Sequence, residues 1–139
     1  MVLMRICLDT SAYSEFKRGH PAAVETISSA REIGIPVIVL GELRTGFSLG
    51  KHRDRNEKEL KEFLAHPTVR ILDIDDETTF HYSEIIVQLR KAGRPLPTND
   101  IWIAAVAARE GATVVTFDEH FEAIQRIGLL ILKREKELG

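Results

Sequence analysis

Four acidic residues stand where apolar stretches of the sequence begin or end, and these are Asp9, Glu42, Asp100 and Asp118. A single carboxylate at such a place usually only complements the positive end of a helix dipole, which contributes ~0.3–1 kcal/mol. Four carboxylates that reach one place would repel one another, and a divalent cation is the usual remedy. The four acids therefore predict a metal site, provided that the fold brings them together.

The other ligand types in the sequence favour magnesium or manganese over zinc. Carboxylate oxygens suit hard cations such as Mg²⁺ and Mn²⁺. The five histidines form no HxxxH or similar pair, and Cys7 is the only cysteine. Cys7 lies in an apolar run, so we expect it to pack as a small buried residue. Acidic clusters that hold Mg²⁺ commonly serve phosphoryl chemistry, in which the metal activates water.

The residues after Asp100 predict a buried helix. Residues 101–108, IWIAAVAA, are apolar at every step, and a helix that is apolar all round lies inside a protein. We expect Thr98 or Asn99 to cap this helix and Trp102 to pack in the core. The acidic run after residue 72 is expected to start another helix, with Asp75 or Asp76 as its cap.

The elements that would position the four acids alternate along the chain. Short apolar runs predict strands, and periods of three to four residues predict helices. The expected strands are residues 4–9, 36–40, 69–74, 113–117 and 128–132, and the expected helices lie within 11–33, 42–49, 51–64, 76–92, 99–110 and around 121–124.

This alternation predicts an α/β fold in which residues 1–139 form a single three-layer α/β/α domain. Its sheet would be mostly parallel, with about five strands and helices on both faces. Right-handed crossovers bring the carboxyl ends of such strands to one edge, where ligands bind. All four acids would lie at that edge or at a helix start facing it, with Glu42 two residues after its strand.

Composition limits the classes of protein that the chain can belong to. The 139 residues include 19 Lys and Arg and 21 Asp and Glu, for a net charge of −2. A general nucleic-acid binder would carry a strong basic excess. No apolar run approaches the ~20 residues that span a bilayer, Arg5 and Asp9 interrupt any secretory signal, and a reducing cytoplasmic setting fits the single cysteine.

One segment, RTGFSLGKHRDR, has a local excess of positive charge. It contains Arg44, Lys51, Arg53 and Arg55. Two interpretations remain equally open, a solvated loop and a set of RNA phosphate contacts. Because the segment follows Glu42, we expect Lys51, Arg53 and Arg55 to lie near the metal edge, where phosphate contacts would position RNA without reading its sequence.

Four segments of the chain resemble the signature segments of the PIN domain, and more narrowly those of VapC-type toxins. They are DTS at 9–11, GELRTG at 41–46, NDIWIAA at 99–105 and TFDEHF at 116–121. The resemblance implies a PIN-like fold and places the catalytic, metal-binding quartet on Asp9, Glu42, Asp100 and Asp118. It further implies supporting hydroxyl groups on Thr10 or Ser11 and on Thr116.

The function implied by the resemblance is that of a Mg²⁺- or Mn²⁺-dependent endoribonuclease, usually a homodimer, silenced by a small VapB-like antitoxin. One alternative keeps the nuclease fold but assigns it to RNA processing without an antitoxin. The other is a Mg²⁺-dependent phosphoacceptor receiver domain. That chemistry requires adjacent acids after the first strand, where this chain has the single acid of LDTS, and it gives Glu42 and Asp100 no role.

Overall fold

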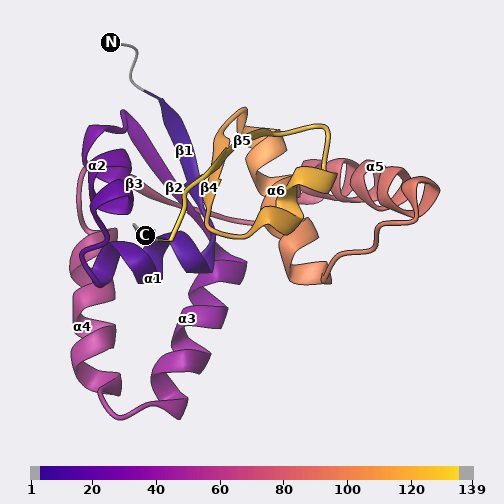
Figure 1. Ribbon diagram of the computed structural model, residues 1–139. Helices are drawn as coiled ribbons and strands as arrows, with labels where there is room; N and C mark the ends of the chain where they lie inside the picture. Colours follow the sequence, from indigo (N-terminus) through magenta and orange to yellow (C-terminus); the bar gives the residue numbers. More distant parts are fainter. Residues whose placement is uncertain (1–3, 135–139) are drawn as a thin grey trace.

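The computed structural model describes residues 4–134 and consists of a parallel sheet with helices packed around it (Figure 1). The strands are β1 (Arg5–Leu8), β2 (Glu32–Pro36), β3 (Val69–Leu72), β4 (Thr113–Thr116) and β5 (Gly128–Ile131). The helices are α1 (Thr10–Lys17), α2 (Pro21–Ser29), α3 (Val37–Leu49), α4 (Arg53–Leu64), α5 (Asp76–Ala92), α6 (Thr98–Glu110) and the 3-10 helix η1 (Glu119–Ala123). None of the helices within the described residues is long and apolar enough to cross a membrane.

The strand order β3-β2-β1-β4-β5 confirms the predicted five-stranded parallel α/β sheet. The chain first adds β2 and β3 on one side of β1, and then crosses over to add β4 and β5 on the other side. The carboxyl ends of β1 and β4 therefore meet at the point where the strand order reverses, which is where α/β sheets bind ligands. In Figure 1 the α3–α4 pair extends beyond this edge as a helical hairpin.

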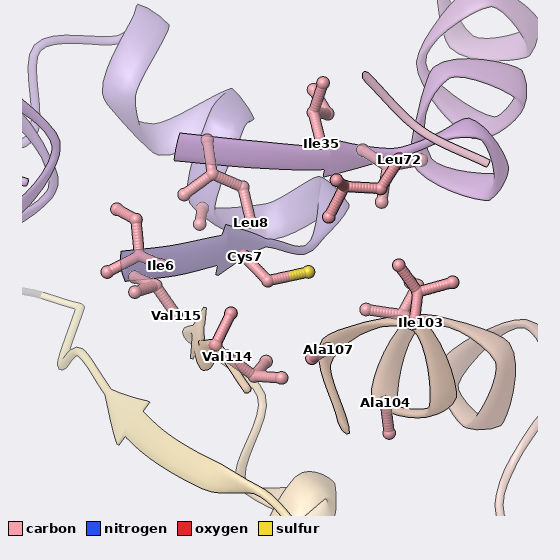
Figure 2. Packing of buried hydrophobic residues seen from close by; sticks show 14 of the residues in the cluster. Ile6, Cys7, Leu8, Ile35, Leu72, Ile103, Ala104, Ala107, Val114 and Val115 are labelled. Carbon is pink, nitrogen blue, oxygen red and sulfur yellow. The ribbon is translucent and has the colours of Figure 1, made fainter. Parts of the chain in front are cut away.

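The core forms around β1, which has strands on both sides. Ile6, Cys7 and Leu8 are at most 1% exposed. Figure 2 shows the Cys7 side chain directed towards Ile103 and Ala107 of α6, while Ile6 and Leu8 point to the opposite face. The expectation that Cys7 packs as a buried residue is confirmed, and burial raises the pKa of its thiol well above the ordinary value.

The prediction of a buried helix after Asp100 is also confirmed, but its start and its tryptophan differ from expectation. Five of its residues are at most 1% exposed. Pro97 occupies the N-cap position without a side-chain cap, so Thr98 and Asn99 lie inside the helix instead of capping it. Trp102 is half-buried and stacks on Tyr82 of α5, with ring centroids 3.8 Å apart, so it joins two helices and is not part of the central core.

The predicted second strand is wrong by four residues. Strand β2 is Glu32–Pro36, and residues 37–40 form the first turn of α3, although they are mostly β-branched. Residues 33–36 are paired with β3, and three residues of the strand also pair with β1. The proline has no N–H to continue a ladder, and its fixed φ suits the residue before a helix. Tertiary pairing thus outweighs the strand propensity of VIVL.

This shift also corrects the expected surroundings of two segments. The helical region expected over 11–33 ends at Ser29, because its last residues belong to β2. Glu42 lies in the second turn of α3, six residues after the end of β2, and not at a helix start. The predicted cap of α5 is confirmed as Asp75, which accepts a hydrogen bond from the Thr78 backbone N–H at 3.0 Å.

Candidate metal-binding and catalytic site

Four elements bring the predicted acids to the carboxyl edge of β1 and β4. Asp9 directly follows β1 and is the N-cap of α1, and Asp118 lies two residues beyond the end of β4. Asp100 is in the first turn of α6, and Glu42 reaches the site from α3. The two strands are neighbours, with Leu8 in register with Val115, so residues more than 100 positions apart become adjacent.

Asp9 is the most buried of the four acids, at 5% exposure, and is held by three donors. One carboxylate oxygen accepts hydrogen bonds from the Ser11 hydroxyl and the Ala12 backbone N–H, both at 2.8 Å. The other oxygen accepts a hydrogen bond from the Thr116 hydroxyl. Burial raises the pKa of Asp9, the neighbouring Asp118 carboxylate adds to the rise, and these three hydrogen bonds oppose it.

The hydroxyl groups of Ser11 and Thr116 connect the end of β1 to the end of β4. Ser11 accepts a hydrogen bond from the Phe117 backbone N–H at 3.0 Å, and Thr116 accepts one from the Asp118 backbone N–H at 2.9 Å. Each hydroxyl therefore donates to Asp9 while it accepts from the segment that carries Asp118. The orientation of one acid is thereby linked to the position of the other.

Glu42 has a separate pair of donors. The Thr10 hydroxyl donates to one carboxylate oxygen, and the Asn99 side-chain amide donates to the other at 3.0 Å. The resemblance left Thr10 and Ser11 as alternatives for one supporting role. In the structure both hydroxyl groups are used, Ser11 on Asp9 and Thr10 on Glu42.

Sequence reasoning missed Asn99 as a site residue, because it treated this side chain only as a possible helix cap. Its amide joins α6 to α3 across 57 residues of sequence. The available signal was its place immediately before Asp100, in a helix that starts at the site.

The pKa of Asp100 is consistent with four carboxylates lying close together. Its pKa is raised to about 6, first by burial and then by the carboxylates of Asp118, Glu42 and Asp9. Asp118 is more exposed than Asp9, and it accepts a hydrogen bond from the His120 backbone N–H at 2.9 Å. The His120 ring lies 3.1 Å from the same oxygen and lowers the pKa of Asp100 slightly.

The residues fit a divalent cation by their chemistry. Mutual repulsion raises the cost of ionising Asp100, and a cation would remove that cost. Within residues 4–134, no three His, Cys, Asp or Glu side chains already stand as a ligand group. One Asp9 oxygen accepts two hydrogen bonds and the other accepts only one, so the second oxygen keeps a lone pair for a cation. An open groove of about 720 Å³, lined by Thr10, Glu42 and Asn99 among others, gives access from solvent.

The basic segment is divided between three places. Arg44 is held by Glu57 through both carboxylate oxygens, at 2.8–3.2 Å. Lys51 and Arg53 are exposed at the turn of the α3–α4 hairpin, beyond Leu49, the last residue of α3, which is about 10 Å from Glu42 along the helix axis. Arg55 lines a polar hollow beside α1. Of the four cations, Arg55 is thus the one that shares a hollow with residues of α1.

Comparison with known proteins gives consistent results over nearly the whole chain. Residues 6–127 match the PIN domain family. The chain is 33% identical to "Ribonuclease VapC2" of Rickettsia felis, over 91% of this chain and 94% of that protein. It is 29% identical to "Ribonuclease VapC5" of Mycobacterium tuberculosis, over 84% and 85% of the two chains.

A solved structure supports the same relationship at the level of the fold. The toxin–antitoxin complex VapBC2 from Rickettsia felis, bound to a DNA fragment from its promoter, contains a chain that superposes with a TM-score of 0.83. The two sequences are 30% identical there, and the match covers 94% of this chain and all of the other.

Proposed function

The chain belongs to the PIN-domain family and, within it, to the VapC-type ribonucleases, and we propose that Asp9, Glu42, Asp100 and Asp118 cleave RNA with Mg²⁺ or Mn²⁺. The observation that carries this proposal is the arrival of all four acids at the carboxyl edge of β1 and β4. Burial and the other three carboxylates accordingly raise the pKa of Asp100. Family membership leaves no basis for the receiver-domain alternative, whose chemistry gave Glu42 and Asp100 no role.

The four carboxylates would hold the metal ion, and the surrounding polar groups have distinct tasks. A bound Mg²⁺ or Mn²⁺ activates water and neutralises the charge that develops on the phosphate. Ser11 and Thr116 fix the orientation of Asp9. Thr10 and Asn99 turn the carboxylate of Glu42 towards the site. Asp100 is in part open to solvent and stays available to the ion.

Cleavage of RNA by the purified chain tests this proposal. We expect total RNA to be cut in the presence of Mg²⁺ or Mn²⁺ and to remain intact with EDTA. The Asp100→Asn variant keeps the side-chain shape but loses the charge, so cleavage should fall by at least about a hundredfold. Asp76→Asn is the matched control, because Asp76 is also an acid in the first turn of a helix. Equal cleavage by both variants would contradict the proposal.

We also propose that a small antitoxin silences the chain in the cytoplasm and that the chain forms a homodimer. An unrestrained ribonuclease would damage its host, and the similar protein of Rickettsia felis is seen in a VapBC2 complex. An arginine from the partner would suit the acidic site, because its planar fork pairs with a carboxylate through two hydrogen bonds.

Expression in two hosts separates a toxin from an RNA-processing nuclease. In a foreign host that lacks the antitoxin, the wild-type chain should arrest growth and Asp100→Asn should be harmless. In the native host, Asp100→Asn should copurify with a small protein encoded nearby. A harmless, folded wild-type chain that retains no partner would instead favour the RNA-processing nuclease.

A further inference from the structure

A polar hollow of about 370 Å³ lies between α1 and the α3–α4 hairpin. Helix α1 contributes Ser14, Lys17 and Arg18 to its wall, and helix α4 contributes Arg55, Asn56 and Glu59. Apolar side chains of α3 complete the lining. Figure 1 shows α1 next to the α3–α4 hairpin, the elements that carry these residues.

Two helices, α1 and α3, carry residues of both the hollow and the acidic site. Thr10, which donates to Glu42, is the first residue of α1. Ser14 is about 6 Å further along the helix axis, and Lys17 about 10 Å. On α3, Leu43 lines the hollow directly after Glu42. A chain that leaves the acidic site along α1 would therefore enter the hollow within one helical turn.

The charge of the hollow is opposite to that of the acidic site. Three cations, Lys17, Arg18 and Arg55, face one carboxylate, Glu59, which leaves a net charge of +2. By contrast, the hollow on the outer face of α4 is lined by three carboxylates and two lysines. A phosphate group that the acidic site repels is thus attracted at the next position along α1.

The cations of the hollow are free to exchange partners. Lys17 Nζ is 3.7 Å from Glu59, and Arg18 is 2.9 Å from Glu15 with 69% of its side chain exposed. Exposed pairs of this kind contribute little, so a phosphate oxygen can replace the carboxylate. Arg55 is exposed and forms no ion pair within the part of the chain that the structure describes.

We propose that this hollow binds the phosphodiester backbone of single-stranded RNA next to the cleaved bond. Lys17, Arg18 and Arg55 contact phosphate oxygens, and Ser14 and Asn56 offer neutral hydrogen bonds. Contacts of this kind fix the register of the strand without reading its sequence. That the bound strand is the one being cleaved rests on the proposed ribonuclease function. The binding of RNA in the hollow does not depend on that function.

Binding of labelled RNA to an uncleaving protein tests the hollow by itself. The full chain carrying Asp100→Asn is titrated into a fluorescent single-stranded RNA in EDTA, at several salt concentrations. Adding Lys17→Ala and Arg55→Ala should weaken binding about tenfold at low salt. It should also flatten the slope of log K against log salt by about 1.4, because each phosphate contact on a single strand contributes about 0.7.

Two further double variants show whether the effect is local. Arg90→Ala with Lys91→Ala, in the last turn of α5, removes the same two types of charge elsewhere and should leave affinity and slope unchanged. Lys51→Ala with Arg53→Ala, at the hairpin turn, should cause a smaller loss than the hollow variant. In the cleaving chain, Lys17→Ala with Arg55→Ala should raise KM and leave kcat unchanged.

The outcomes separate this proposal from the ribonuclease proposal. An unchanged slope in the hollow variant, with circular dichroism and Tm like those of the parent, overturns the hollow whether or not the wild type cleaves RNA. A loss equal to that of the α5 variant, or a loss found only at the hairpin turn, also overturns it. Intact RNA binding with loss of the copurifying protein would make the hollow a protein-docking surface. Failure of the wild type to cleave, with the slope difference retained, would remove only the ribonuclease proposal.

Discussion

At Asp100, burial and neighbouring carboxylates disfavour the ionised form, whereas the start of a helix favours it. It is half-buried at the start of an apolar helix, and its pKa is raised to about 6, first by this burial and then by three other carboxylates. A helix start alone would favour the ionised form and lower the pKa. Burial and the crowding of carboxylates act in the opposite direction and raise the pKa of Asp100.

The raised pKa predicts a pH-dependent gain in stability for Asp100→Asn. The folded-state pKa, about 6, lies above the ordinary value of 3.8 for an aspartate, so the folded protein is less stable when Asp100 is ionised. The penalty is complete above pH 6 and absent below about pH 3.8. Without metal, the variant should melt above the wild type at pH 7, and the difference should shrink towards pH 4.

Thermal unfolding in EDTA from pH 4 to pH 8 measures this difference. Addition of Mn²⁺ at pH 7 should raise the Tm of the wild type more than that of the variant, because the ion binds only to the folded state. A variant that melts well below the wild type at pH 7 would mean that Asp100 serves chiefly as a helix-start residue.

Asn99 is expected to tune the metal site through Glu42. Asn99→Ala removes the donor to one Glu42 oxygen and should weaken Mn²⁺ binding about tenfold, in the range found for groups that orient metal ligands. Electron paramagnetic resonance of free Mn²⁺ measures the affinity without relying on cleavage. Thr98→Ala, one residue earlier in the same turn, is the control. Equal affinities for the two variants would reduce Asn99 to a structural contact.

At the scale of elements, the close approach of β2 and β3 depends on Gly34. A Cβ at this position would lie 2.4 Å from Cδ1 and 3.0 Å from Cγ of Leu72, which is itself buried. Because the strand carries paired neighbours on both sides, it has little freedom to shift. Leu72 would have to repack inside the core.

Gly34→Ala should therefore lower the free energy of unfolding by about 1–3 kcal/mol, the usual cost of overpacking. Gly46→Ala is the matched control, because that position lies in α3 with nothing within 4 Å of the new Cβ. The control should stabilise the protein by roughly 0.5–1 kcal/mol through helix propensity. Urea unfolding measures both, and a neutral Gly34→Ala would show that Leu72 repacks freely.

The order of the elements was predictable from the sequence, while the position of β2 was not. Apolar runs and helical periods predicted four of the five strands and the buried helix after Asp100. The run VIVL was wrongly assigned to the second strand, because residues 37–40 are mostly β-branched yet follow a proline that ends the paired strand. Periodicity describes a segment by itself, whereas β2 is defined by its two neighbours.

The nearness of Asp9, Asp100 and Asp118 could be predicted from the sequence because each stands close to the end of an apolar element, whereas Glu42 lies in the second turn of α3. The pairing of Thr10 and Asn99 with Glu42 could not be predicted, because it joins three helices whose packing the sequence does not state. For the same reason the basic segment was expected next to the acids, whereas α3 carries most of it to the far end of the hairpin.

At the scale of the whole molecule, helix α5 offers a surface for the proposed homodimer. Phe80 and Val87 are 67% and 47% exposed and lie two turns apart on one face. Exposed apolar side chains grouped in this way mark interaction surfaces. Light scattering after size exclusion should give a dimer for the wild type and a monomer for Phe80→Glu. Leu49→Glu, at an 84% exposed position on α3, should remain a dimer. A monomeric wild type, or a dimeric Phe80→Glu, would exclude this surface.

The pairing of β1 with β4 also sets the time at which a nascent chain can become an enzyme. The hydrogen bond between Asp9 and Thr116 joins residues 107 positions apart. At synthesis rates of roughly 5–20 residues per second, Asp9 leaves the ribosome many seconds before its partner strand exists. A growing chain therefore carries its acids apart and inactive, and it gains a complete site only after β4 and Asp118 have been made. The messenger and ribosome that produce it are thus not exposed to a finished site before that point.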